Sequence, residues 1–189
     1  NSGDFVHIKG NVNEYKEALQ LVIKNMETFS ANEINPADFL PMTRRNIEDM
    51  FERLLKVTAS IETVYFRQLI QAFLNDENFV REFKIAPAAK KMHHAYLGGL
   101  LEHTLSMAVL ADKISGHYSG VDRDMLLAGA LLHDIGKTRE FCYDVMIDYS
   151  DEGRLLSHIV IGLEMLDEKL CQIGDVPREG AHRLKHMII

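Results

Sequence analysis

The 189-residue sequence contains no tryptophan, four prolines and only two cysteines, Cys142 and Cys171. Two cysteines are too few for a disulfide framework, and their spacing is unlike that of a zinc finger, so we expect structural thiols in a reducing cytoplasm. The sequence also lacks a run of eighteen or more apolar residues and a basic-then-apolar leader. We therefore expect a cytoplasmic protein with no membrane partner.

Positive charge is scarce, because 21 lysines and arginines stand against 28 acidic residues, giving a net charge of −7. A surface that binds duplex DNA needs clustered basic residues, so this balance argues against such a surface over the whole molecule. Any nucleic acid must be held locally. Hydrophobic residues make up 47% of the chain, which is enough for one core with a small appendage.

Near the N-terminus, apolar and polar residues alternate at 3–10 and again in parts of 15–26, with Gly10, Asn11 and Asn13 as turn formers between them. This pattern predicts a β-hairpin. Two strands alone are marginally stable, so the hairpin either packs on the rest of the chain or belongs to a larger sheet. Polar residues and prolines at 32–41 predict a linker.

After Pro41 the apolar residues follow a helical period. Thr43 is the expected N-cap of a helix that continues to Lys56. Further helical patterns cover 61–75, 77–84, 97–116, 123–136, 154–170 and 177–189, which predicts an all-α helical bundle. Residues 141–153 fit either a small hairpin or an ordered loop.

Two of the predicted helices carry histidines among apolar residues. His103 shares a helix face with Leu100, Met107, Leu110 and Ile114, which predicts that its imidazole lies on a buried stripe. A lone histidine there is usually a hydrogen-bonded core residue. His133 and Asp134, however, follow the wholly apolar run 125–132, which directs a carboxylate at the core. An unpaired buried charge costs several kcal/mol, so Asp134 needs a cation, and a metal ion suits better than a neutral His–Asp pair.

Two imidazoles and a carboxylate suit divalent first-row metals and leave positions open for water and substrate oxygens. The metal would act as a Lewis acid and supply hydroxide near neutral pH. Gly136 is expected to end the helix, so that Lys137 can turn back toward the ligands. We expect Lys137 and Asp134 to be catalytic, with Lys137 stabilising charge on a phosphoryl oxygen.

Four other histidines are weaker candidates. His158 shares a predicted inward face with Leu155, Ile161 and Met165, so it would bind a second metal or a substrate phosphate. His182 and His186 are four residues apart, and a solvated surface is as good an interpretation, so only His186 is expected to contact substrate. His94, after Lys90 and Lys91, would meet a phosphate at a helix N-terminus, although an exposed loop without a role is the alternative.

The order His103, His133-Asp134, Ile-Gly-Lys137 resembles the HD superfamily of metal-dependent phosphohydrolases. The longer segments 93–104, 126–137 and 153–159 are similar to the YhaM family of bacterial 3′-to-5′ exoribonucleases. The similarity extends to residues 3–10 and 20–23, which resemble the closing strands of that family's N-terminal OB-fold, and to 36–41 in its linker.

This resemblance implies three regions: strands of an incomplete OB-fold at 1–30, a linker and connecting helix at 31–58, and an HD-domain helical bundle at 59–189. It implies that His103, His133 and Asp134 bind manganese or a similar ion (cobalt, nickel, iron or zinc), with His158 in the second half of the site. The family continues beyond a segment like 184–189 with Ser-His-His-Gly and a later aspartate ligand. We therefore expect this sequence, which begins at Asn1, to be a piece of a longer protein.

The leading hypothesis is an exonuclease that cleaves single-stranded RNA from its 3′ end and releases nucleoside 5′-monophosphates, with Phe5 and Tyr15 as candidate stacking platforms. The alternative within the superfamily is a cyclic-dinucleotide or nucleotide phosphohydrolase. A third hypothesis is a non-catalytic nucleic-acid-binding module on an HD scaffold. Single-stranded RNA is the expected partner, and a homo-oligomer is compatible with the sequence.

Overall fold

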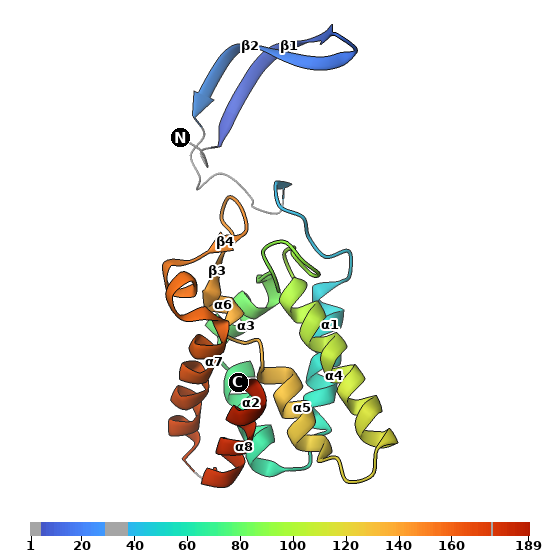
Figure 1. Ribbon diagram of the computed structural model, residues 1–189, viewed down its shortest axis with the longest axis vertical. Helices are drawn as coiled ribbons and strands as arrows, with labels where there is room; N and C mark the ends of the chain where they lie inside the picture. The colour runs from blue at the N-terminus through green and yellow to red at the C-terminus, as the bar shows by residue number, and fades with distance from the viewer. Residues whose placement is uncertain (1–4, 29–37, 175) are drawn as a thin grey trace.

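The computed structural model describes residues 5–28, 38–174 and 176–189. An N-terminal hairpin is followed by a helical body, as Figure 1 shows. The hairpin consists of β1 (Val6–Tyr15) and β2 (Ala18–Thr28). The body contains α1 (Ile47–Ala59), α2 (Val64–Leu74), α3 (Glu77–Ile85), α4 (Gly99–His117), α5 (Arg123–Leu132), α6 (Lys137–Glu140), β3 (Phe141–Cys142), β4 (Asp148–Tyr149), α7 (Asp151–Ile173) and α8 (Arg178–Ile188). The predicted mostly helical architecture with a hairpin is confirmed.

The hairpin turns at a different place from the predicted one. Its turn is at Lys16 and Glu17, which both have positive φ (50° and 64°), as a two-residue hairpin turn requires. Gly10 instead lies inside β1, where the register shifts between Lys9 and Gly10. A side chain at Gly10 would place Cβ 2.4 Å from the Val22 carbonyl oxygen. The glycine therefore permits a close backbone approach at a bulge and forms no turn.

The bulge collects the apolar residues of the hairpin on one face. Val12 pairs with Leu21, and Ile8 pairs with Met26, so the apolar positions of β2 change from odd to even numbers across the bulge. Because alternate residues of a strand point to opposite faces, one face carries Val6, Ile8, Val12, Leu19, Leu21, Ile23 and Met26. All seven are exposed. Within the described residues, nothing covers this face.

Four of the helices, α1, α3, α5 and α7, begin at a residue whose side chain caps them. Asn46 caps α1 by accepting from the N–H groups of Glu48 and Asp49. The predicted cap, Thr43, lies before α1 and donates to Glu102 of α4 at 2.6 Å. α2 has no side-chain cap from its own N-cap residue. The two N–H groups just before it, those of Glu62 and Thr63, donate to Asp124 of α5.

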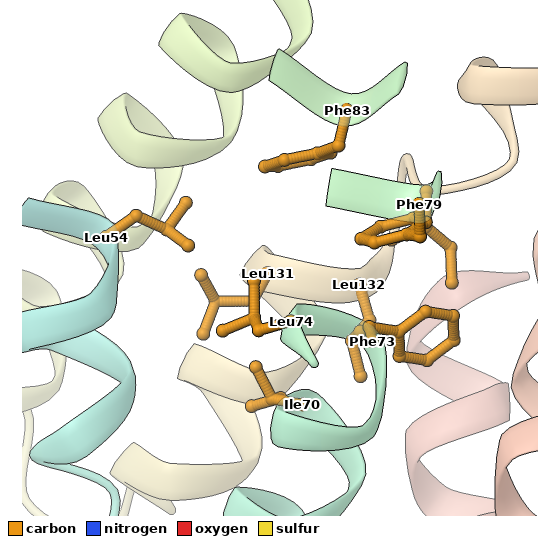
Figure 2. Close-up of a pocket in the computed structure, with 9 residues that line it drawn as sticks. Leu54, Ile70, Phe73, Leu74, Phe79, Phe83, Leu131 and Leu132 are labelled. Carbon is orange, nitrogen blue, oxygen red and sulfur yellow. The ribbon is translucent and has the colours of Figure 1, made fainter. Parts of the chain in front are cut away.

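The core lies where α1, α2, α3 and α5 meet. Figure 2 shows apolar side chains from these four helices directed at one another: Leu54, Ile70, Phe73, Leu74, Phe79, Phe83, Leu131 and Leu132. The void among them is only about 10 Å³, so it is packed interior and no ligand site. This core holds the C-terminal end of α5 in place, and the residues after that end form the candidate site.

The chain after α5 differs from the predicted continuous helix to residue 136. α5 ends at Leu132, and Gly136 has right-handed helical angles (φ −61°, ψ −18°), so it does not end a helix as a left-handed cap. A Cβ at Gly136 would lie 2.0 Å from the His158 carbonyl oxygen. The glycine therefore allows α7 to pack against this turn. Residues 141–153, which fitted two interpretations, form the short β3–β4 hairpin and the start of α7.

α7 is broken at Ser157, whose φ is 61°. The break changes the helical phase, so Leu155 is 83% exposed whereas Ile161 and Met165 are buried. The prediction that Leu155 shares an inward face with His158 is wrong for this reason. None of the helices in the described ranges is both long and apolar enough to span a membrane.

Candidate metal centre

Three predicted ligands converge where α4 approaches the end of α5. The Nε2 atom of His133 is 3.2 Å from Oδ2 of Asp134, and Nε2 of His103 is 3.4 Å from the same oxygen. The two Nε2 atoms are 3.4 Å apart. The ligand atoms of all three residues lie within 4.8 Å of one another, a spacing that could hold a metal ion.

Hydrogen bonding decides where the lone pairs of these residues point. Nδ1 of His133 lies 3.1 Å from the carbonyl oxygen of Ala130, one turn earlier. A carbonyl oxygen only accepts, so Nδ1 carries the proton and the neutral ring has its lone pair at Nε2. That lone pair faces the Asp134 carboxylate, which is also an acceptor. Acceptors directed at one another at this distance require a cation between them, so the donor set fits a divalent metal.

The protonation states agree with this arrangement. Burial lowers the pKa of His103 to about 4, and the nearby Asp134 charge opposes this only in part, so His103 is neutral at pH 7. Burial by itself raises the pKa of Asp134. Contact with a His133 ring that carries a proton on Nε2, as it can when no metal is bound, and with the Lys137 ammonium lowers it more, so the pKa lies below the ordinary value. The centre therefore offers neutral imidazole and an ionised carboxylate, the forms that bind metals.

Lys137 turns back to the centre, as the sequence predicted. Its ammonium donates to Oδ2 of Asp134 at 2.7 Å, and both side chains are largely buried. This is the cation that neutralises the carboxylate in the structure. The contact puts a positive charge beside the place where substrate phosphate would meet the centre.

His158 approaches the other oxygen of the carboxylate. Its Nε2 is 3.6 Å from Oδ1 of Asp134, while Nδ1 is 3.0 Å from Oε1 of Glu140. Glu140 also accepts from the His158 backbone N–H at 2.9 Å. Because Nδ1 donates to Glu140, the neutral ring presents its lone pair toward Asp134. Asp134 therefore has an imidazole near each of its oxygens, so His158 could help to hold a metal ion there.

Glu140 is 4% exposed, and sequence reasoning missed it. It lies in the four-residue helix α6, whose existence no periodicity predicted. Its distance of eighteen positions from His158 is bridged only by the turn from α6 through the β3–β4 hairpin into α7. The one sequence signal was an acidic residue close to Gly136-Lys137.

A polar pocket of about 470 Å³ opens beside the centre. Lys90, Lys91 and Lys137 line it together with Tyr149 and His158. Lys90 donates to Asp148 at 2.5 Å, whereas Lys91 is exposed. Lys90 and Lys137 are paired with Asp148 and Asp134, and the buried Glu140 also lines the pocket. Among the described residues, Lys91 is therefore the lining lysine without a salt bridge.

The predicted buried stripe of α4 is only half right. His103 is partly buried, but Met107, Leu110 and Ile114 are exposed and line a groove of about 300 Å³ that reaches His133. α4 has two apolar faces, and the core contacts are made by the other one, which carries Leu101, Leu105 and Ala108. Periodicity identifies a face of a helix but not its neighbour, which explains the error.

The remaining predicted site residues lie in three places. The His94 ring lies beside His103, with their centroids 5.5 Å apart, and its Nδ1 is 2.8 Å from the Tyr96 hydroxyl. His182 and His186 are exposed on α8 and do not join the cluster of His103, His133 and Asp134. At the hairpin, the Phe5 ring packs on Phe39, and Tyr15 is exposed.

Comparison with known proteins gives two family matches. A family model described as a putative helicase matches residues 31–119, which include His103 but not His133 or Asp134. No solved structure matches the chain significantly. A family model described as the HD domain matches residues 100–182, the region that contains His103, His133, Asp134, Lys137 and His158. This match, together with the geometry of the cluster, supports the HD-domain phosphohydrolase superfamily as the family of this part of the chain.

Proposed function

We propose that the protein is a metal-dependent phosphodiesterase that degrades single-stranded RNA from its 3′ end. The observation that carries the metal-dependent hydrolysis is the convergence of acceptor atoms from His103, His133 and Asp134 on one point. These three residues would hold the ion, and His158 would hold a second one against Asp134. When bound, such an ion polarises a phosphoryl oxygen and activates water at neutral pH.

The protein's own residues bind and orient the phosphate. Lys137 lies close enough to the centre to donate to a phosphoryl oxygen, and Lys90 and Lys91 line the same pocket. Such charges stabilise a phosphoryl group that becomes more negative in the transition state. The second hydrogen bonds of His133 and His158 hold the two rings in place before substrate arrives.

The N-terminal hairpin supports RNA as the substrate. Its uncovered apolar face is expected of strands that belong to a closed barrel such as an OB-fold, where one face packs inward. OB-folds bind single strands by stacking and backbone contacts, and Tyr15, on the polar face, would be available for stacking.

The metal centre and its pocket fit a nucleotide or cyclic-dinucleotide phosphohydrolase equally well, so this remains the alternative. A non-catalytic nucleic-acid-binding module is the third candidate. An ATP-driven helicase has no support at the site, because Gly136-Lys137-Thr138 is preceded by Leu131 where a phosphate-binding P-loop has its first glycine.

The test compares the wild-type protein, Asp134→Ala and the control Asp144→Ala, whose carboxylate is exposed in the β3–β4 loop. Metal content after dialysis and the hydrolysis of 3′-labelled RNA, cyclic dinucleotide and nucleotide would be measured with added manganese. We expect Asp134→Ala alone to lose both metal and hydrolysis. Hydrolysis of the small substrates with intact RNA would select the alternative, and metal binding without any hydrolysis would select the binding module.

A further inference from the structure

A chain of hydrogen bonds leads from a buried carboxylate in α4 to His94, beside the metal centre. Glu102, which is 9% exposed, accepts from the Tyr96 hydroxyl at 3.0 Å. The same hydroxyl is 2.8 Å from Nδ1 of His94. Thr43 at 2.6 Å and the Arg45 Nε at 3.0 Å complete the surroundings of the carboxylate. This series of hydrogen bonds is separate from those that hold His133 and His158.

This series of hydrogen bonds determines which nitrogen of His94 carries the proton. The Glu102 carboxylate pairs with the Arg45 guanidinium and takes hydrogen bonds from Thr43 and Tyr96, so it acts as an acceptor. The single hydroxyl proton of Tyr96 is donated in the hydrogen bond to Glu102. Burial and the neighbouring Glu102 raise the pKa of that hydroxyl, so it keeps its proton. The Tyr96 oxygen can then only accept from His94. Nδ1 must donate, which leaves the lone pair of the neutral ring at Nε2.

The backbone around His94 is held in a conformation that a histidine rarely adopts. Its φ is 58°, in the left-handed region. Its carbonyl oxygen accepts from the Ala88 N–H at 3.1 Å, and a Cβ at Gly99 would lie 2.1 Å from that oxygen. The surroundings therefore maintain an unfavourable conformation, which is common where a side chain must be presented accurately.

The His94 ring lies beside a candidate ligand of the metal centre. The His94 and His103 rings meet edge to face with centroids 5.5 Å apart, and His94 is partly buried. Within residues 5–28, 38–174 and 176–189, Nε2 of His94 has no hydrogen-bond partner. A lone pair there is repelled by an anionic phosphate oxygen but accepts from a hydroxyl or a water.

We propose that Glu102 and Tyr96 are positioning residues that hold His94 with its proton on Nδ1, so that Nε2, on a ring beside the candidate ligand His103, accepts a hydrogen bond from water or a substrate hydroxyl. The identity of the group that donates to Nε2 rests on the proposed function. The position of the proton does not, because it follows from the hydrogen bonds of the protein alone. This assignment replaces the expected phosphate contact of His94 with a contact to a donor.

The first test is the tautomer of His94 in the metal-free full chain, read from ¹⁵N and ¹³C chemical shifts of histidine-labelled protein at a pH where the ring is neutral. We expect the Nδ1–H form in the wild type. Tyr96→Phe keeps the aromatic ring but removes the acceptor, so His94 should revert to the Nε2–H form that free histidine prefers. Tyr118→Phe, which changes an exposed tyrosine after α4 that packs against His117, should leave the His94 signals unchanged. An Nε2–H form in the wild type, or no change in Tyr96→Phe, would overturn the proposal.

The second test separates the role at the centre from the tautomer itself. With metal content equal to the wild type, Tyr96→Phe should lower kcat by roughly tenfold or more while KM moves little, because misplaced catalytic hydrogen bonds act mainly on the reacting state. A switched tautomer with unchanged kcat would refute the role at the centre. Absence of hydrolysis in the wild type would refute the proposed function, and the spectrum would still decide the tautomer.

Discussion

The site is made at the scale of single residues by hydrogen bonds that fix the outer nitrogen of each imidazole. Ala130 binds His133, Glu140 binds His158 and, in our proposal, Tyr96 binds His94. In each case Nδ1 is engaged and Nε2 is left as an acceptor. A cluster of acceptors is unfavourable without a cation, so the stability of this region should depend on which cation is present.

Lys137→Met tests this dependence. The substitution keeps the aliphatic stem and removes the cation that pairs with buried Asp134. We expect the metal-free protein to lose about 3 kcal/mol of unfolding free energy, because the carboxylate is left unpaired, and manganese to restore much of it. Lys185→Met, which breaks a pair with exposed Asp167, should cost under about 1 kcal/mol with or without metal. Denaturant unfolding curves give both values, and equal losses in the two variants would contradict the prediction.

The contribution of Lys137 to catalysis is measured in a separate experiment. If its charge stabilises the phosphoryl group in the transition state, Lys137→Met should lower kcat about a hundredfold at normal metal content. If the variant binds metal normally and its kcat stays near the wild-type value, Lys137 has no catalytic role and only neutralises Asp134.

Gly136 is required by close packing and not by its conformation. In Gly136→Ala, the new Cβ would lie 2.0 Å from the His158 carbonyl oxygen, so α7 must move away. We expect a loss of about 2–3 kcal/mol. Metal content should also fall if His158 contributes a ligand. Gly116→Ala is the matched control, since no atom lies within 4 Å of its Cβ in α4, and it should be neutral or stabilising by up to about 1 kcal/mol.

At the scale of the elements, a residue of one helix binds the backbone at the start of another. Oδ2 of Asp124, in the first turn of α5, accepts from the N–H groups of Glu62 at 2.9 Å and Thr63 at 2.6 Å, where α2 begins. The carboxylate therefore pairs the two N–H groups that immediately precede α2, whose N-cap residue Thr63 makes no side-chain cap. It also fixes the angle between α2 and α5, which both contribute to the core under the metal centre.

We expect Asp124→Ala to lower the unfolding free energy by about 1–2 kcal/mol and Asp124→Asn, which keeps an acceptor oxygen, to lose less. Burial raises the pKa of Asp124, but the bonds from Thr63 and Glu62 lower it more, so the folded pKa is depressed. A depressed carboxyl pKa stabilises the fold above the unfolded pKa and loses this effect as pH falls toward the folded pKa. The wild type and Asp124→Ala should therefore converge in thermal stability in acid. A difference that stays constant to pH 2 would contradict the assignment.

At the scale of the whole molecule, the hairpin and the helical body are stabilised separately. Every apolar side chain on the hairpin's uncovered face is exposed, whereas the body has its own core. The segment that does bind to the N-terminal side of the body is residues 41–43, and not the hairpin. Thr43 N–H donates to the Leu97 carbonyl at 2.9 Å, and Leu97 N–H donates to Pro41 at 2.8 Å.

A pair of truncations tests this division. Removing residues 1–37 should change the melting temperature of the body by no more than about 2 °C and leave metal content unchanged, because little buried apolar area is lost. Removing residues 1–45 should lower the melting temperature clearly, because Glu102 then loses Thr43 and Arg45 and remains a buried charge with fewer partners. Similar melting temperatures for the two truncations would show that segment 41–45 is dispensable.

The sequence by itself determined most of the helices and the residues of the candidate metal centre. Apolar periodicity located the helices, and the pair His133-Asp134 after residues 125–132 required a cation at the end of α5. Local chemistry of this kind depends on neighbours within a few positions, which the sequence displays directly. Where a local signal had two meanings, it failed: Gly10 marked a bulge and not a turn, and the outer face of α4 was apolar without being buried.

Only the tertiary structure decided which atoms complete the site. The break at Ser157 turns His158 toward Asp134, Gly136 allows α7 to approach, and Glu140 becomes the partner of His158 across eighteen positions. The contact of Glu102 with Thr43 joins residues that are 59 positions apart. The physical reason is that a helix face fixes the direction of a side chain but not what it meets. Hydrogen-bond partners, and with them the tautomer of each imidazole, exist only once the helices have packed.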